Sequence, residues 1–140
     1  MLKLTEKLDD TLWNLGLLIL RVTTGCLLAF GHGWGKLTGF STMAPQFADP
    51  FGLGTTFSLA MTVFAEFFCA LAVAFGIFAR IATLPLIIMF LTIILIINTN
   101  EPWGEKEFAL LYLIPFVTIL LTGPGKYSLD NMVFKWKRPE

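Results

Sequence analysis

Charged side chains are scarce in this sequence. Lysine, arginine, aspartate and glutamate make up 14% of its 140 residues, whereas 56% of the residues are hydrophobic. A water-soluble domain normally carries about 25% charged residues, so this chain lacks the polar surface that a soluble globule needs. Its ten basic and ten acidic residues also cancel, and a net charge of zero gives no indication of nucleic-acid binding. The composition therefore favours a protein that lies in a membrane.

Side chains that bind metals or form covalent intermediates are also few. The chain has one histidine, His32, and two cysteines, Cys26 and Cys69, without a Cys-x-x-Cys motif. A single histidine gives little support for protein-bound haem or a histidine-rich metal site. Along membrane helices the two cysteines would differ in depth by about 8 Å, more than the ~4.4–6.8 Å between the Cα atoms of a disulfide. We therefore expect no metal site, no thiol relay and two cysteines that pack as apolar residues.

Four apolar runs lie between the charged segments. They predict membrane-spanning helices over approximately residues 11–36, 55–78, 80–98 and 105–122. A helix needs about 20 apolar residues, with a usual range of ~17–25, to cross the ~30 Å hydrocarbon core. The first three runs meet this length, whereas the last has a short apolar part that contains Pro115. We predict an all-α fold, an integral membrane four-helix bundle with short loops that forms one transmembrane domain over residues 1–140.

The longest link between the predicted spans, residues 37–54, is unusually apolar. It contains two prolines and three glycines, but also five large apolar residues: Phe40, Met43, Phe47, Phe51 and Leu53. Such a segment is too apolar for a free loop in water. We expect it to lie at the outer membrane interface or to fold over the bundle as a lid.

Basic residues are distributed unevenly over the predicted topology. With four crossings, the side that holds both termini carries Lys3, Lys7, Arg80, Lys126, Lys135, Lys137 and Arg138, whereas the opposite loops carry only Lys36 and Lys106. Cytoplasmic loops have an excess of lysine and arginine. We therefore predict a multi-pass protein of the cell inner membrane with both termini in the cytoplasm.

Two ionisable residues fall inside the predicted spans, Arg21 in the first and Glu66 in the second. A charged residue costs at least ~2.5–3.5 kcal/mol in hydrocarbon and is usually paired or functional. At ~1.5 Å per residue, Arg21 would lie about 12 Å and Glu66 about 16 Å from the cytoplasmic face, so the sequence permits an ion pair between them. Such a pair either fixes the register of two helices or lines a polar pocket that binds a headgroup or moves a proton.

A second polar cluster is predicted at the outer end of the first span. His32 and Lys36 are four residues apart and share one helical face if the helix continues past the glycines at 31, 33 and 35. Glycines there let the backbone approach a neighbouring helix or a ligand closely. The candidate ligand-binding or proton-handling residues are therefore Arg21, Glu66, His32 and Lys36, with no metal ligands among them.

Several of these residues occur in a characteristic order. The series is Leu20-Arg21, Gly31, Lys36-Leu37, Glu66, Gly76, Arg80 and Gly123-Pro124-Gly125-Lys126-Tyr127-Ser128-Leu129-Asp130. This set, from about Leu15 to Asp130, resembles the DoxX family. The resemblance implies a four-helix membrane protein, typically bacterial or archaeal, associated with quinone or redox chemistry. Such proteins include a subunit of thiosulfate:quinone oxidoreductase and membrane partners of oxidative-stress enzymes.

Three functions remain open at this point. The first is a quinone-interacting subunit of a membrane oxidoreductase that works with a soluble oxidoreductase partner. The second is a small proton-coupled transporter in which Glu66 titrates. The third is a non-catalytic membrane anchor or assembly factor. The expected partners are the lipid bilayer, a soluble oxidoreductase subunit and further copies of the chain, without nucleic acid, and the candidate cofactor is a quinone.

Overall fold

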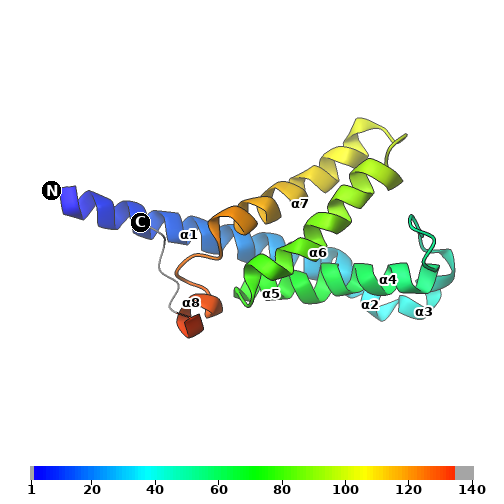
Figure 1. The fold of residues 1–140 in the computed structure, drawn as a ribbon, viewed down its shortest axis with the longest axis horizontal. Helices are drawn as coiled ribbons and strands as arrows, with labels where there is room; N and C mark the ends of the chain where they lie inside the picture. The colour runs from blue at the N-terminus through cyan, green and yellow to red at the C-terminus, as the bar shows by residue number, and fades with distance from the viewer. Residues whose placement is uncertain (1, 135–140) are drawn as a thin grey trace.

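The regular structure of the chain is helical (Figure 1). A computed structural model describes residues 2–134, and within this range it contains no strand. In chain order the elements are α1 (Leu2–Leu28), η1 (Ala29–Gly33), α2 (Trp34–Thr38), α3 (Phe40–Met43), η2 (Ala44–Gln46), α4 (Thr55–Val63), η3 (Phe64–Cys69), α5 (Ala70–Phe75), α6 (Ala79–Thr92), η4 (Ile93–Ile97), α7 (Trp103–Thr122) and α8 (Leu129–Phe134). The predicted all-α fold is confirmed. Lys135, Lys137 and Arg138, on which part of the predicted orientation rests, lie outside the described residues.

The first long helix runs without interruption from α1 through the π-helical η1 into α2. The continuous helix Lys3–Thr38 has 36 residues, which at 1.5 Å per residue is about 54 Å and exceeds the ~30 Å of the hydrocarbon core. The helix begins at Leu2 instead of near residue 11, and the N-terminal part of α1 projects beyond the other helices (Figure 1). The glycines at 31, 33 and 35 do not end it.

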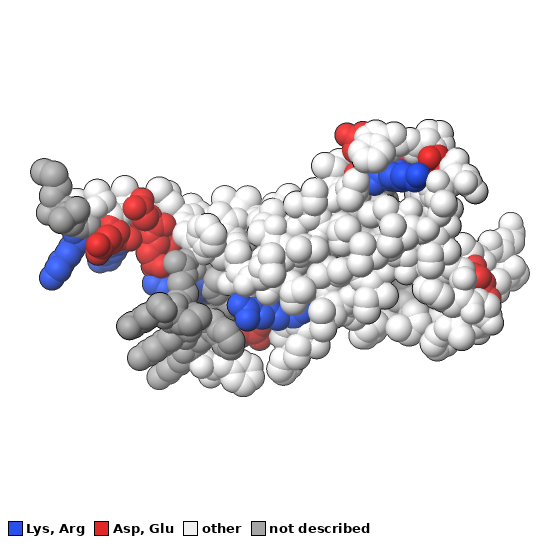
Figure 2. Space-filling view, turned by 45° about the horizontal axis from the view of Figure 1, so that its top comes forward, with Lys and Arg blue, Asp and Glu red and all other residues white. Residues whose placement is uncertain are grey.

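Two further helices among residues 2–134 are long and apolar enough to cross a membrane. One is Thr55–Phe75, with 21 residues in α4, η3 and α5, and the other is Ala79–Ile97, with 19 residues in α6 and η4. The 20-residue α7 packs along α6 but has three charged residues near its start, at positions 105–107, so its crossing stays a prediction. Figure 2 shows charged side chains over the left part of the molecule, as far as a group below its middle, and again at the right, with a wide uncharged surface between them, as expected of a protein in a bilayer.

Three residues, 76–78, join α5 to α6 in a tight turn. Gly76, which follows the last residue of α5, adopts the left-handed conformation with φ of 73°, and Ile77 N–H donates to the carbonyl of Ala72 at 2.8 Å. Phe78 also has a positive φ, 44°, which is uncommon for a residue with a side chain. We call this end of the molecule the turn end, and the opposite end, which carries residues 38–54 and the α6–α7 link, the loop end.

Small residues form the contact between the first two long helices. Gly25, Ala29 and Gly33 recur every four residues on one buried face of the first helix. A Cβ atom added to Gly25 would lie 2.5 Å from the carbonyl oxygen of Ala70, and one added to Gly33 would lie 2.8 Å from that of Glu66. Small residues at this spacing let membrane helices approach until their backbones touch.

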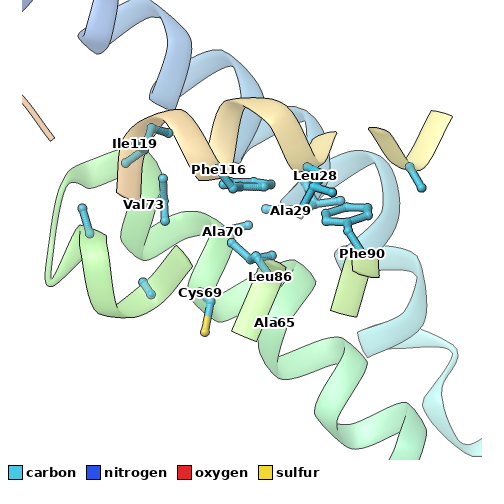
Figure 3. Close-up of a cluster of buried hydrophobic side chains, with 14 residues drawn as sticks. Leu28, Ala29, Ala65, Cys69, Ala70, Val73, Leu86, Phe90, Phe116 and Ile119 are labelled. Carbon is cyan, nitrogen blue, oxygen red and sulfur yellow. The ribbon is translucent and has the colours of Figure 1, made fainter. Parts of the chain in front are cut away.

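Larger side chains fill the space between this contact and the other two long helices. Figure 3 shows Ala29 and Ala70 beside Leu28, Leu86 and the rings of Phe90 and Phe116. The two rings stack with their centroids 6.2 Å apart. Cys69 is buried in the same core, and both cysteines are free thiols. The core therefore joins α1, η3, α5, α6 and α7 into one packed body.

The apolar link at the loop end folds back onto α4. Leu37, Phe40 and Phe47 pack against a small cluster of Ala44, Leu59 and Val63. The Asp49 carboxylate closes the segment by accepting hydrogen bonds from Leu53 N at 3.0 Å, Gly54 N at 2.8 Å and Ser58 Oγ at 2.9 Å. The Gly54 bond is the main reason why the pKa of Asp49 is lowered. The segment therefore covers the outer part of α4.

A valine at position 25 tests the small-residue contact. Its side chain would collide with the backbone of Ala70, and overpacking of this kind costs about 1–3 kcal/mol. Gly16→Val is the matched control because it lies in the same helix with nothing within 4 Å of its Cβ position. We expect Gly25→Val, and not Gly16→Val, to lower the unfolding temperature of the purified protein in detergent. Equal effects of the two substitutions would contradict the contact.

Candidate functional site

A buried ion pair joins the first two long helices. The Nζ atom of Lys36, in α2, lies 2.5 Å from Oε2 of Glu66, in η3, and the two side chains are 19% and 7% exposed. Each charge is costly on its own in a low-dielectric environment and is compensated by the other. The pair therefore needs both helices to be in place.

Two π-helical segments bring this pair together. Glu66 lies in η3, which contacts η1 of the neighbouring helix. Gly33, the last residue of η1, packs directly on the peptide of Glu66, where a Cβ would lie 2.8 Å from its carbonyl carbon. Lys36 follows less than one helical turn later and reaches back to the carboxylate. Single π-helical turns are rare and occur frequently at functional sites.

Aromatic rings from α6 and α7 complete this region. The His32 ring lies 5.2 Å from that of Phe108 and 5.9 Å from that of Tyr112. Tyr112 stacks on Phe90, with 5.5 Å between centroids and 3° between planes. We call Lys36, Glu66, His32 and Tyr112 the outer polar cluster.

The sequence predicts the outer polar cluster only in part. His32 and Lys36 were expected on one helical face, and both belong to the cluster, His32 through ring contacts and Lys36 through its ion pair. Tyr112 was not predicted. Its one signal in the sequence is that it is the single tyrosine within the four apolar runs.

The predicted ion pair between Arg21 and Glu66 is wrong. Arg21 is buried, with 2% of its surface exposed, and its Nη2 donates to the carbonyl oxygen of Tyr127 at the turn end. Side chains on a helix lean towards its N-terminus. Because the two helices are antiparallel, Arg21 leans towards the turn end and Glu66 towards the loop end, so similar depths of their Cα atoms do not bring the charged groups together.

Arg21 instead contacts a segment that folds across the turn end, residues 123–130, which we call the clasp. A Cβ at Gly76 would collide with Nη1 of Arg21 and would lie 2.5 Å from Cβ of Ser128. The Nε and Nη1 atoms of Arg21 have no hydrogen-bond partner among the described residues, and Asp130 supplies the nearby negative charge. The glycine therefore makes room for the guanidinium beneath the clasp.

Asp130 fixes the end of the clasp to the α5–α6 turn. Its carboxylate accepts hydrogen bonds from Phe78 N at 2.7 Å and Ala79 N at 2.9 Å, and its own N–H donates to Gly76 O at 2.8 Å. A carboxylate at the N-terminus of α6 satisfies free N–H groups and interacts favourably with the helix dipole. Asp130 also explains how Phe78 is held at positive φ.

The other end of the clasp is fixed to α1. Asn14, which is 3% exposed, accepts a hydrogen bond from Lys126 N at 2.8 Å. The ammonium group of Lys126 pairs with Asp10 one turn earlier in α1. The roles of Asn14 and Asp130 were not predicted from the sequence, where residues 123–130 stood out only as part of a family resemblance.

The DoxX family profile matches residues 16–99, more than half of the chain. This chain belongs to the DoxX family. The match includes Arg21, His32, Lys36 and Glu66, whereas Tyr112 and the clasp lie beyond it. No solved structure matches the chain.

Two bacterial relatives are similar over nearly the whole chain. The "Inner membrane protein YqjF" of Escherichia coli (strain K12) is 28% identical over 134 residues, covering 93% of this chain and 98% of that protein. The "Putative oxidoreductase CatD" of Bacillus subtilis (strain 168) is 31% identical over 127 residues, covering 90% and 92%. Family membership and three long apolar helices together make this chain a membrane protein.

The outer polar cluster combines a proton donor and a proton acceptor within an aromatic environment. Lys36 offers an ammonium group, Glu66 a carboxylate, and Phe67 and Trp34 lie alongside with their rings 5.8 Å apart. Such a cluster suits a flat molecule with polar oxygen atoms, because rings contact its faces and the charged groups its oxygens. Among residues 2–134, no group of three or more histidine, cysteine, aspartate or glutamate side chains is arranged to hold a metal ion.

Removal of one member of the ion pair leaves the other charge buried, which typically costs about 3–5 kcal/mol. Glu66 is the more buried partner. We therefore expect Lys36→Gln, which strands Glu66, to destabilise the purified protein more than Glu66→Gln does. The double variant should be more stable than the sum of the single effects predicts, as measured by chemical unfolding in detergent. If the two substitutions lower the free energy of unfolding additively, Lys36 and Glu66 do not stabilise each other.

Asp130→Asn tests the clasp. It removes the negative charge near Arg21 and one of the two carboxylate oxygens at the start of α6, and hydrogen bonds to charged groups contribute about 1.5–3 kcal/mol. We expect a lower unfolding temperature and faster proteolysis after Lys126. Asp9→Asn, an exposed carboxylate of α1, is the control and should change neither. An unchanged Asp130→Asn protein would contradict the role of the carboxylate.

Proposed function

We propose that this protein is the membrane subunit of a redox system and that its outer polar cluster binds the headgroup of a quinone-like lipophilic molecule. The observation that carries the proposal is the buried Lys36–Glu66 pair at the contact of two π-helical segments. A buried ion pair that served only packing would be replaceable by apolar residues at little cost. The name of one relative, "Putative oxidoreductase CatD", also supports a redox role.

The chemistry of a quinone fits the groups that the cluster offers. Lys36 donates a hydrogen bond to one carbonyl oxygen, and Glu66 exchanges the proton that the oxygen gains when quinone becomes quinol. Reduction takes up two electrons and two protons. The electrons come from a soluble oxidoreductase partner, and both protons come from water by way of Glu66, which takes up and passes on one proton at a time. Lys36 is the more exposed member of the pair, so it is the group that a ligand reaches first.

The ligand reaches the cluster from the lipid. Phe30, Trp34 and Phe68 are 60%, 51% and 53% exposed on the surface beside Glu66, and Phe67 connects them through ring contacts with all three. Their exposed rings face hydrocarbon in a bilayer. A lipophilic molecule can therefore slide along this surface with its headgroup towards Lys36 while its tail remains among the acyl chains.

The proposal includes a membrane arrangement. Four crossings, by the three long apolar helices and α7, place both termini in the cytoplasm and the outer polar cluster in the outer half of the inner membrane. The distribution of lysine and arginine supports this orientation, and the name of the Escherichia coli relative supports the location. The turn end then faces the cytoplasm, and the soluble partner that supplies the electrons docks at the loop end, beside the outer polar cluster.

Quinone binding can be measured through Trp34, whose ring lies 5.8 Å from that of Phe67 beside the cluster. Purified protein in nanodiscs is titrated with a short-chain ubiquinone and a short-chain menaquinone analogue, and quenching of tryptophan fluorescence is recorded. Loss of a hydrogen bond to a charged group corresponds to about a 10- to 100-fold weaker Kd, which we expect for Lys36→Gln and Glu66→Gln.

The controls are Lys106→Gln and Glu107→Gln, which change charges at the loop end outside the cluster. They should bind the analogue as the wild type does. Equal affinity of Lys36→Gln and Lys106→Gln, at matched stability, would refute the assigned site. Failure of the wild type to bind either analogue would refute the proposed function and favour a membrane anchor.

A further inference from the structure

The outer side of α1 carries an apolar stripe with a regular repeat. Its residues follow one another at alternating spacings of four and three: Leu8, Leu12, Leu15, Ile19, Val22 and Cys26. The aliphatic side chains among them are between 39% and 58% exposed, and Cys26 is half-buried. Six successive apolar residues at this spacing are the a and d positions of a coiled coil. We call these six residues the α1 seam.

The other helices of the chain cover the opposite side of α1. Asn14, Leu17, Arg21 and Leu28 are buried, and at about 100° per residue they lie on the face opposite the seam. The clasp reaches this same side, where Lys126 pairs with Asp10. The bundle therefore holds the helix from one side and leaves the seam on the outer surface.

The seam passes from water into the hydrocarbon region without a break. Residues 3–10 carry five charges, and this part of α1 projects beyond the other helices (Figure 1). Leu4 and Leu8 are nevertheless 76% and 57% exposed there, and large apolar side chains exposed to water mark a binding surface. The repeat continues in the same register through residues 15–26, where the one charged residue is the buried Arg21.

A second copy of α1 is the partner that matches both parts of the seam. Helices that lie on a bilayer surface have a polar face rich in lysine and arginine, whereas residues 3–10 carry two basic and three acidic side chains. A soluble protein would cover the part in water and leave Ile19 and Val22 untouched. Another copy is inserted in the same orientation and has the same repeat, so its helix covers Leu8 and Ile19 alike.

We propose that this protein forms a parallel dimer in the membrane through the α1 seam. A two-fold axis along the membrane normal brings each seam residue next to its equivalent in the other copy. None of the five charges of residues 3–10 occupies a seam position, so the contact is apolar along its length. The seam ends one turn before Phe30, and the exposed rings beside the outer polar cluster stay in contact with lipid in both copies.

Disulfide cross-linking in membranes tests the seam. Leu8→Cys and Glu6→Cys are made separately in the full-length chain with Cys26→Ala and Cys69→Ala, and both positions lie on the charged part of α1, where copper phenanthroline reaches thiols. Paired seam residues come within the ~4.4–6.8 Å between Cα atoms of a disulfide, so Leu8→Cys should form covalent dimers at least about tenfold faster than Glu6→Cys. Equal rates would indicate random collisions and overturn the proposal.

The affinity between copies is measured separately. Fluorescently labelled protein is reconstituted in large liposomes at falling protein-to-lipid ratios, and subunits are counted by single-molecule photobleaching. Leu8→Gln removes an apolar contact from each copy and should weaken the dimer at least about tenfold, whereas Lys7→Gln, in the same turn but off the seam, should associate as the wild type does.

Two results would overturn the dimer. One is a wild-type protein that is monomeric at every ratio, and the other is an unchanged affinity of Leu8→Gln. In the monomeric case, reaction of Leu8→Cys with a water-soluble maleimide identifies what covers the seam instead. Protection in pure lipid would assign it to the bilayer surface, and protection only in native membranes would assign it to a soluble protein.

Discussion

The structure depends on one contact, the approach of the first two long helices along Gly25, Ala29 and Gly33. No hydrophobic effect drives helices together within a lipid bilayer, so close packing and polar contacts must hold them. Gly25 brings the backbone of α1 onto Ala70, and Gly33 brings η1 onto Glu66. Without this approach Lys36 would not reach Glu66, and the rings of α6 and α7 would have no packed surface to cover.

Much of the fold can be predicted from the sequence because it depends on hydropathy averaged over whole segments. Apolar runs separated by charge predict helices, and the helices appear close to their expected places, although the first starts at Leu2 and the crossing by α7 stays a prediction. The length of α1 could not be read from hydropathy, since the charged residues 3–10 form a helix outside any apolar run. Helix formation and membrane crossing are different properties.

The candidate site is less predictable than the fold because it depends on the directions in which individual side chains point. The sequence indicates that Arg21, Glu66, His32 and Lys36 are the unusual residues. It suggests Arg21 as the partner of Glu66, whereas the structure pairs Glu66 with Lys36. Arg21 and Glu66 have Cα atoms at similar depths in the membrane. Their charged groups still lie apart, because side chains on antiparallel helices lean in opposite directions. The π-helical turns that place Glu66 next to Gly33 have no simple signal in the sequence. The clasp requires hydrogen bonds between residues more than 50 positions apart, such as those of Asp130 with Phe78.

The charged residues of the first helix lie in two separate regions of the molecule, and the electrostatic interaction between these regions is weak. Arg21 belongs to the turn end and Lys36 to the loop end, and the buried small residues Gly25, Ala29 and Gly33 lie between them. Fifteen residues of helix separate their Cα atoms by about 22 Å. At an effective dielectric constant of about 20, two unit charges at that distance interact by only about 0.8 kcal/mol. Charges at the two ends therefore influence each other only weakly, and stronger communication between the ends would have to pass through the packing of Gly25 and Gly33 against the second helix.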